Sequence, residues 1–74
     1  MKISRGGDMQ ITVNGRQKEI TDSANLKSVV QQFCRDTEHV IAEVNGQIVK
    51  SQRWTEQPIK NGDIVELINF VGGG

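Results

Sequence analysis

The chain contains few of the residues on which disulfide-stabilised and metal-binding folds depend. Its 74 residues include one cysteine, one histidine and one proline. A lone Cys34 forms no internal disulfide, and together with His39 it falls short of the four side-chain ligands of a structural zinc site. We therefore expect no disulfide framework, no metal site and a reducing compartment, the cytoplasm.

An excess of charge of one sign and long apolar runs are also missing. Nine Lys and Arg residues balance nine Asp and Glu residues, so the formal net charge is zero. A balanced chain has no electrostatic footprint for nucleic acid. No apolar run approaches the roughly 20 residues of a transmembrane helix, and residues 1–8 lack the apolar stretch of a signal peptide. We expect neither nucleic acid nor a membrane as a partner.

The common catalytic motifs are absent as well. No GxxxxGK[ST] loop occurs, and no GxGxxG follows a predicted strand, so the chain has no recognisable nucleotide site of its own. Cys34 and His39 could form a nucleophile and base, but a half-buried thiol and a surface imidazole are the simpler interpretation. The acidic residues are scattered over different predicted elements and offer no acid–base pair. The sequence predicts no intrinsic catalytic residue.

The first half of the chain predicts a hairpin followed by a helix. Met9, Ile11 and Val13 alternate with polar residues, which indicates a strand. Asn14-Gly15 predicts a tight turn into a second strand over residues 16–20. An apolar stripe then recurs at helical spacing after Asn25, the expected N-cap. Its members are Leu26, Val29, Val30 and Phe33. We expect all four in the core and the helix to end near Asp36 or Thr37.

The second half predicts three more strands. Residues 40–44 are mostly apolar and are expected to be central in the sheet, and Asn45-Gly46 joins them to a short strand over residues 47–49. Residues 51–60 are expected to be irregular, with Trp54 as a local plug, before a last strand over residues 64–71. This order predicts an α+β fold in which one main helix packs across a mixed sheet of about five strands.

The two ends of the chain fall outside the expected domain of residues 9–71. Residues 1–8 show no periodicity, and we interpret them as a disordered leader or an expression remnant. Residues 72–74 are glycines, which lack a Cβ and are costly to order, so we expect a flexible tail. Such a tail could thread a narrow channel. The α-carboxylate of Gly74 has an ordinary pKa of about 3.5, so it is ionised and needs activation by a partner before it can react.

Several segments resemble the ThiS family of sulfur carriers in thiamine biosynthesis. They are MQITVNG, LKSVVQQF, IAEVNGQIV with Trp54, NGDIVEL and the ending FVGGG. The resemblance covers residues 9–74 and implies the ubiquitin-like β-grasp fold. Two departures are Lys50, where proline is common in the family, and Gly72, an extra glycine before the final pair.

The resemblance also implies a carrier's chemistry. A ThiF-like activating enzyme, using ATP and magnesium, would adenylate Gly74, while this chain binds no cofactor itself. Sulfur from a persulfide on another protein would displace AMP and leave a thiocarboxylate. A ThiG-like thiazole synthase would then take up the sulfur. Gly72 and Gly73 would thread the tail into these enzymes.

The residues before the tail suggest where partners dock. If Val65 and Leu67 face the helix, Ile64, Glu66, Ile68 and Phe70 share the opposite face. An apolar patch on an open sheet face indicates an interaction surface. We expect Ile68, Phe70 and Val71 to contact the activating enzyme and thiazole synthase, with ordinary packing against residues 51–60 as the alternative.

Three other functions fit parts of the same pattern. The small subunit of molybdopterin synthase shares the fold, the final glycines and the activation chemistry, and differs in its partner. A ubiquitin-like protein modifier would instead be joined to lysines through Gly74. A plain interaction domain would make no chemical use of the tail.

Overall fold

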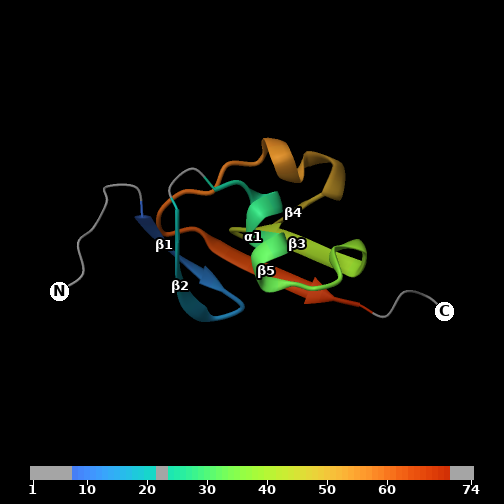
Figure 1. The fold of residues 1–74 in the computed structure, drawn as a ribbon, viewed down its shortest axis with the longest axis horizontal. Helices are drawn as coiled ribbons and strands as arrows, with labels where there is room; N and C mark the ends of the chain where they lie inside the picture. Colours follow the sequence, from blue (N-terminus) through green and yellow to red (C-terminus); the bar gives the residue numbers. More distant parts are fainter. Residues whose placement is uncertain (1–7, 22–23, 71–74) are drawn as a thin grey trace.

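The computed structural model describes residues 8–21 and 24–70, which form a five-stranded mixed sheet with one main helix packed across it (Figure 1). The strand order is β2-β1-β5-β3-β4. The predicted α+β class and layout are confirmed. The predicted leader and tail lie outside the described residues, except that Asp8 already belongs to the first strand.

The first hairpin joins β1 (Asp8–Val13) to β2 (Arg16–Thr21). Asn14 and Gly15 take φ values of 51° and 83°, the paired positive values that a tight type I′ turn needs. In β1 the side chains of Met9, Ile11 and Val13 are buried and those between them lie outward, as the alternation predicts.

The helix α1 (Leu26–Phe33) begins at the predicted N-cap. The side chain of Asn25 accepts the N–H of Ser28 at 2.9 Å, while the Ser28 hydroxyl accepts the N–H of Asn25 at 3.1 Å. This reciprocal capping box satisfies amide groups that the first helical turn leaves unpaired.

The helix ends earlier than the sequence pattern predicted. Cys34 leaves the helix with φ −129° and ψ 136°, although its N–H still bonds to the carbonyl of Val30. Asp36 then caps a separate turn, η1 (Thr37–His39), by accepting the N–H of Glu38 at 3.0 Å. A local aspartate cap therefore competes with continuation of α1. Phe33 in the last turn is only partly buried, against the expectation of a core position.

A second hairpin joins β3 (Val40–Val44) to β4 (Gln47–Val49) at the predicted boundaries. Its turn again has positive φ, 52° at Asn45 and 85° at Gly46. The strand β3 is internal, between β5 and the edge strand β4, so the central position expected for it belongs to β5.

The segment expected to be irregular contains the 3₁₀ helix η2 (Ser51–Glu56). Trp54 is buried within it, and its indole N–H donates to the carbonyl of Val49 at 2.9 Å. The predicted plug is confirmed. The same hydrogen bond links η2 to the end of β4, so the two short elements stabilise each other.

The central strand is β5 (Ile64–Asn69), which pairs parallel with β1 and antiparallel with β3. Val65 and Leu67 face α1 and are buried, whereas Ile64, Glu66 and Ile68 lie outward, as predicted. The strand ends two residues before the predicted position 71. Phe70 follows the strand, and Val71 lies outside the described residues.

A single apolar core fills the space between α1 and the sheet. The largest fully buried side chains come from β1, α1 and β5, and they are Ile11, Leu26, Val29, Val30 and Val65. No buried side-chain polar atom within the described ranges lacks a hydrogen-bond partner. The core occupies one face of the sheet only, which leaves the other face open.

Candidate functional site

The open face of the sheet carries an apolar patch around the C-terminal half of β5. Ile68 is 45% exposed and Phe70 is 42% exposed, so both are available for contact. Ile64 is outward-facing on the same strand, and Ile41 and Ile48 extend the patch onto β3 and β4. We call these five residues the outer patch. This exposure favours contact with a partner, while packing against residues 51–60 stays an alternative for Phe70, which lines a pocket together with Trp54 of η2.

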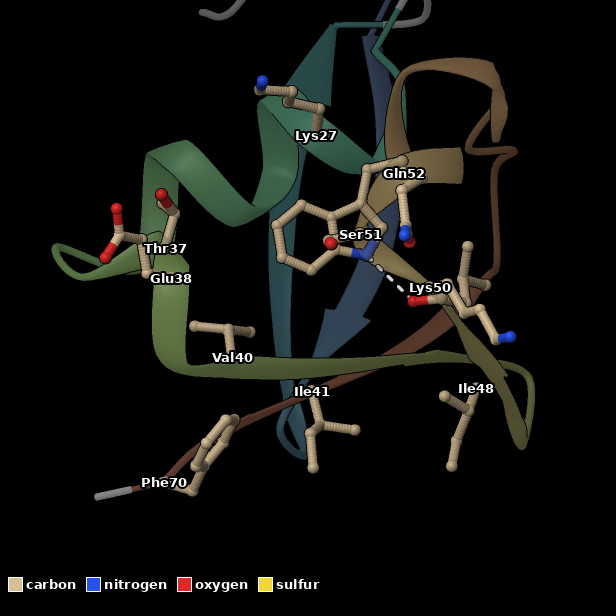
Figure 2. Close-up of a pocket in the computed structure, with 12 residues that line it drawn as sticks. Lys27, Thr37, Glu38, Val40, Ile41, Ile48, Lys50, Ser51, Gln52 and Phe70 are labelled. Carbon is tan, nitrogen blue, oxygen red and sulfur yellow. Dashed lines mark hydrogen bonds between the residues drawn. The ribbon is translucent and has the colours of Figure 1, made fainter. Parts of the chain in front are cut away.

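The outer patch follows from strand alternation and register. Ile41 stands directly opposite Ile68 across β3 and β5. Figure 2 shows Ile41, Ile48 and Phe70 projecting to one side of β3 while Val40 projects to the other. The patch therefore reaches the point where the chain leaves β5 for the predicted glycine tail.

A pocket of about 610 Å³ lies at the edge of β3, beyond the end of β4 (Figure 2). Lys27 of α1 and Trp54 of η2 line it from the helix side, and Ile41 and Phe70 line it from the outer side. The pocket therefore opens where the two sides of the sheet meet, next to the outer patch. The charged residues among its lining are Lys27, Glu38 and Lys50.

His39 holds Phe70 at the end of the patch. The two rings meet edge to face with centroids 5.6 Å apart, and the Phe70 N–H donates to the His39 carbonyl at 2.9 Å. On its other side, His39 Nδ1 donates to Oδ2 of Asp36 at 2.7 Å. This hydrogen bond raises the pKa of His39 and lowers the pKa of Asp36. The sequence pattern did not link these residues, because His39 is the last residue of η1, whose geometry depends on the Asp36 cap.

Cys34 does not have the surroundings of a reactive thiol. Its side chain is half-buried, and desolvation raises its pKa, which disfavours the thiolate. His39 makes its hydrogen bond to Asp36 and makes none to Cys34. The two residues weighed as nucleophile and base are therefore not paired.

Neither a cluster of metal ligands nor a membrane-spanning helix is found among the described residues. Residues 8–21 and 24–70 contain no group of three His, Cys, Asp or Glu residues placed to hold a metal ion. Over the same ranges, no helix has the length and apolar character needed to span a bilayer. The predicted modification site Gly74 lies outside the described residues, as do Gly72, Gly73 and Val71.

The comparison with protein families matches residues 11–74 to the ThiS family. Among individual relatives, the sulfur carrier protein ThiS of Bacillus subtilis is 28% identical over 65 residues, covering 86% of this chain and 98% of that protein. A crystal structure of the thiamine biosynthesis protein ThiS from Geobacter metallireducens has a TM-score of 0.78 at 30% identity. The match covers 89% of this chain and all of that one.

A thiazole synthase from Paramagnetospirillum magneticum also contains a similar segment. It is 26% identical over 66 residues, covering 89% of this chain. This chain spans only 20% of that protein's length. Similarity therefore extends to one part of a much longer protein.

Proposed function

The chain belongs to the ThiS family of sulfur carriers, and from this premise we propose that it carries sulfur on the C-terminal carboxylate of Gly74. The observation that carries the proposal is the extent of the family match, which runs over residues 11–74 and so includes the final glycines. β5 leads towards these glycines, and the outer patch lies beside the end of that strand.

The carboxylate must be activated before sulfur can be added. In the proposed sequence, a carboxylate oxygen of Gly74 attacks the α-phosphorus of ATP on a ThiF-like activating enzyme, and pyrophosphate leaves. That partner supplies the nucleotide and magnesium sites, since no phosphate-binding loop occurs in this chain. The product is an acyl adenylate, whose carbonyl carbon is a far better electrophile than a carboxylate.

Sulfur then replaces AMP. A persulfide sulfur of a donor protein attacks the carbonyl carbon of Gly74, and AMP departs with the bonding electron pair. A thiol reduces the resulting acyl disulfide, which leaves a thiocarboxylate on this chain and a disulfide on the donor side. The role of this chain is to present its terminus, so it acts as a substrate and carrier with no catalytic residue of its own.

Two regions of the chain would present the C-terminus to the partner enzymes. Ile68, Phe70 and Val71 contact the partner enzymes, and Gly72 and Gly73 pass through the channel that leads to the reacting carbon. Exposure of Ile68 and Phe70 supports the first assignment, and the absence of side chains on glycine supports the second.

A ThiG-like thiazole synthase is the proposed acceptor of the sulfur. A named thiazole synthase contains a segment similar to this chain, and the two other named relatives are ThiS proteins. These similarities favour thiazole synthase over the large subunit of molybdopterin synthase. They also favour sulfur transfer over conjugation to lysines.

Intact-mass spectrometry provides the test. The protein is incubated with a ThiF-like enzyme, ATP, magnesium and a persulfide donor. We expect a mass gain equal to replacing one oxygen by sulfur, located in the peptide that ends at Gly74. A folded protein that gains no sulfur, beside a control carrier that does, would contradict the proposal.

A further inference from the structure

The outer patch surrounds a pair of like charges. Glu43 of β3 stands directly opposite Glu66 of β5, and on its other side Glu43 faces Ile48 of β4. Ile41 and Ile68 form the next cross-strand pair along the same two strands. Two acidic residues are therefore cross-strand neighbours within a frame of exposed isoleucines.

This arrangement of charges does not stabilise the fold of the chain on its own. Side chains directly opposite in an antiparallel pair have Cβ atoms about 4.5–5.5 Å apart, and like charges there are destabilising. No lysine or arginine in the described ranges forms an ion pair with Glu43 or Glu66. Within the described ranges, the fold therefore places two like charges opposite each other among apolar side chains and offsets neither of them with an ion pair.

The basic residues of the strands lie on the other side of the sheet. Lys18 is opposite Ile11, a buried position, and its ammonium group lies 5.8 Å from the centre of the Phe33 ring. Arg16 is opposite the buried Val13. By alternation, the outward positions of the five described strands carry acidic, amide, threonine and isoleucine side chains and no lysine or arginine. This face is therefore acidic, although the formal net charge of the whole chain is zero.

We propose that the Glu43–Glu66 pair receives a basic side chain of the activating enzyme, with apolar side chains of that enzyme seated on the surrounding isoleucines. The inference rests on the proposed function, which makes the activating enzyme the partner that first takes up the tail. Arginine fits best, because its planar guanidinium bonds two carboxylate groups at once. The surrounding apolar contacts exclude water from the ion pairs, which strengthens them.

The test compares binding of isosteric variants to the activating enzyme by isothermal titration calorimetry. Glu43→Gln and Glu66→Gln are made singly and together. Asp8→Asn is the matched control, since it removes one carboxylate from the outer face at the far end of β1. We expect about a tenfold rise in Kd for each single variant, little change for the control, and loss of the salt dependence of Kd in the double variant.

Thermal unfolding shows whether the variants are folded, so that a change in Kd can be assigned to the interface. The double variant should unfold at the same temperature as the wild type or at a higher one, because a repulsion is removed. A folded double variant with the wild-type Kd and salt dependence would overturn the inference. The mass-spectrometric assay separates this failure from that of the proposed function. If the wild type gains sulfur but the double variant binds the activating enzyme as tightly as the wild type, the role of the carboxylate pair alone is refuted. If the double variant binds more weakly but the wild type gains no sulfur, the carrier chemistry alone is refuted.

Discussion

The side-chain amide of Asn14 makes two hydrogen bonds with the backbone of Leu67, donating to its carbonyl at 3.1 Å and accepting its N–H at 2.7 Å. Asn14 stands where β1 turns away into the first hairpin, next to the central strand β5. Its amide presents one donor and one acceptor, as a further strand residue would. The ladder between β1 and β5 is thereby extended past the turn.

Asn14→Gly should destabilise the fold while keeping the turn. Glycine accepts the positive φ of this position, so the loss comes from the two hydrogen bonds to Leu67. Each contributes about 0.5–1.5 kcal/mol net, and we expect a fall of about 1–3 kcal/mol in the free energy of unfolding. Urea denaturation measures it. Asn14→Asp keeps the acceptor and loses the donor, so its free energy of unfolding should lie between those of Asn14→Gly and the wild type. Equal stability of Asn14→Gly and the wild type would disprove the role of the amide.

The turns show how far the sequence could predict this fold. Asn14-Gly15 and Asn45-Gly46 indicated both hairpins, because positive φ is a local property of these residue pairs. Their second role was not predictable. Asn45 Oδ1 accepts the N–H of Ile64 at 2.9 Å, so this turn is also fastened to β5. That contact joins residues 19 positions apart and depends on the tertiary arrangement.

The pairing of His39 with Asp36 should be visible by NMR titration. His39 is the chain's single histidine, so its imidazole signals are assigned without ambiguity. The hydrogen bond to Asp36 raises the pKa of His39 above its ordinary value of 6.5. In Asp36→Asn the pKa should fall towards 6.5. Glu38→Gln, which removes a lesser charge effect, should change it less. An unchanged pKa in Asp36→Asn would contradict the pairing.

The same pair gives stability a defined pH dependence. The pKa of Asp36 is lowered in the folded state, so its contribution is full above about 3.8 and is lost as the pH falls through the lowered value. The pKa of His39 is raised, so its contribution is full below 6.5 and is lost as the pH rises through the raised value. The pair should therefore stabilise the fold most between these limits. Urea unfolding of wild type and Asp36→Asn across pH would show the difference closing at both ends.

Truncations in α1 should separate the two ends of its apolar stripe. Leu26 is fully buried, and Leu26→Ala should cost about 2–5 kcal/mol. Phe33 is only half-buried, so Phe33→Ala should cost less than the roughly 3–5 kcal/mol of a buried phenylalanine. Urea denaturation of both variants checks the order. A larger loss for Phe33→Ala than for Leu26→Ala would place Phe33 in the core.

The candidate site was predictable in part for a similar physical reason. Alternation along residues 64–70 is a local pattern, and it is sufficient to predict that Ile68 and Phe70 lie on the open face. Ile41 and Glu43 join them only through the register between β3 and β5, and Ile48 only through that between β3 and β4. The order of strands across a sheet does not follow from the alternation within each strand. The carboxylate pair therefore depends on the tertiary fold.

Ile68→Ala should weaken docking without harming the fold. Ile68 is 45% exposed, so its truncation creates no core cavity, and it leaves the charges of the outer face unchanged. We expect KM for the carrier in the adenylation reaction to rise several-fold with kcat little changed, since truncating a residue important for an interface costs about 1 kcal/mol or more. Gln17→Ala, on the outer face of β2, is the control. A folded Ile68→Ala variant with wild-type KM would exclude Ile68 from the docking surface.

Substitution in the glycine tail should stop sulfur transfer while leaving the folded domain intact. Gly73 comes after the end of β5 at Asn69, so Gly73→Val replaces no residue of the described core. In a channel that admits bare backbone, a β-branched side chain next to the reacting residue should prevent Gly74 from reaching ATP. We expect unchanged thermal unfolding and binding weakened at most modestly, with no sulfur gain in the intact mass. Gly72→Val, one residue further from the carboxylate, should be impaired less. Normal thiocarboxylation of Gly73→Val would mean that the tail does not need to be slender, and its glycines would then require another explanation.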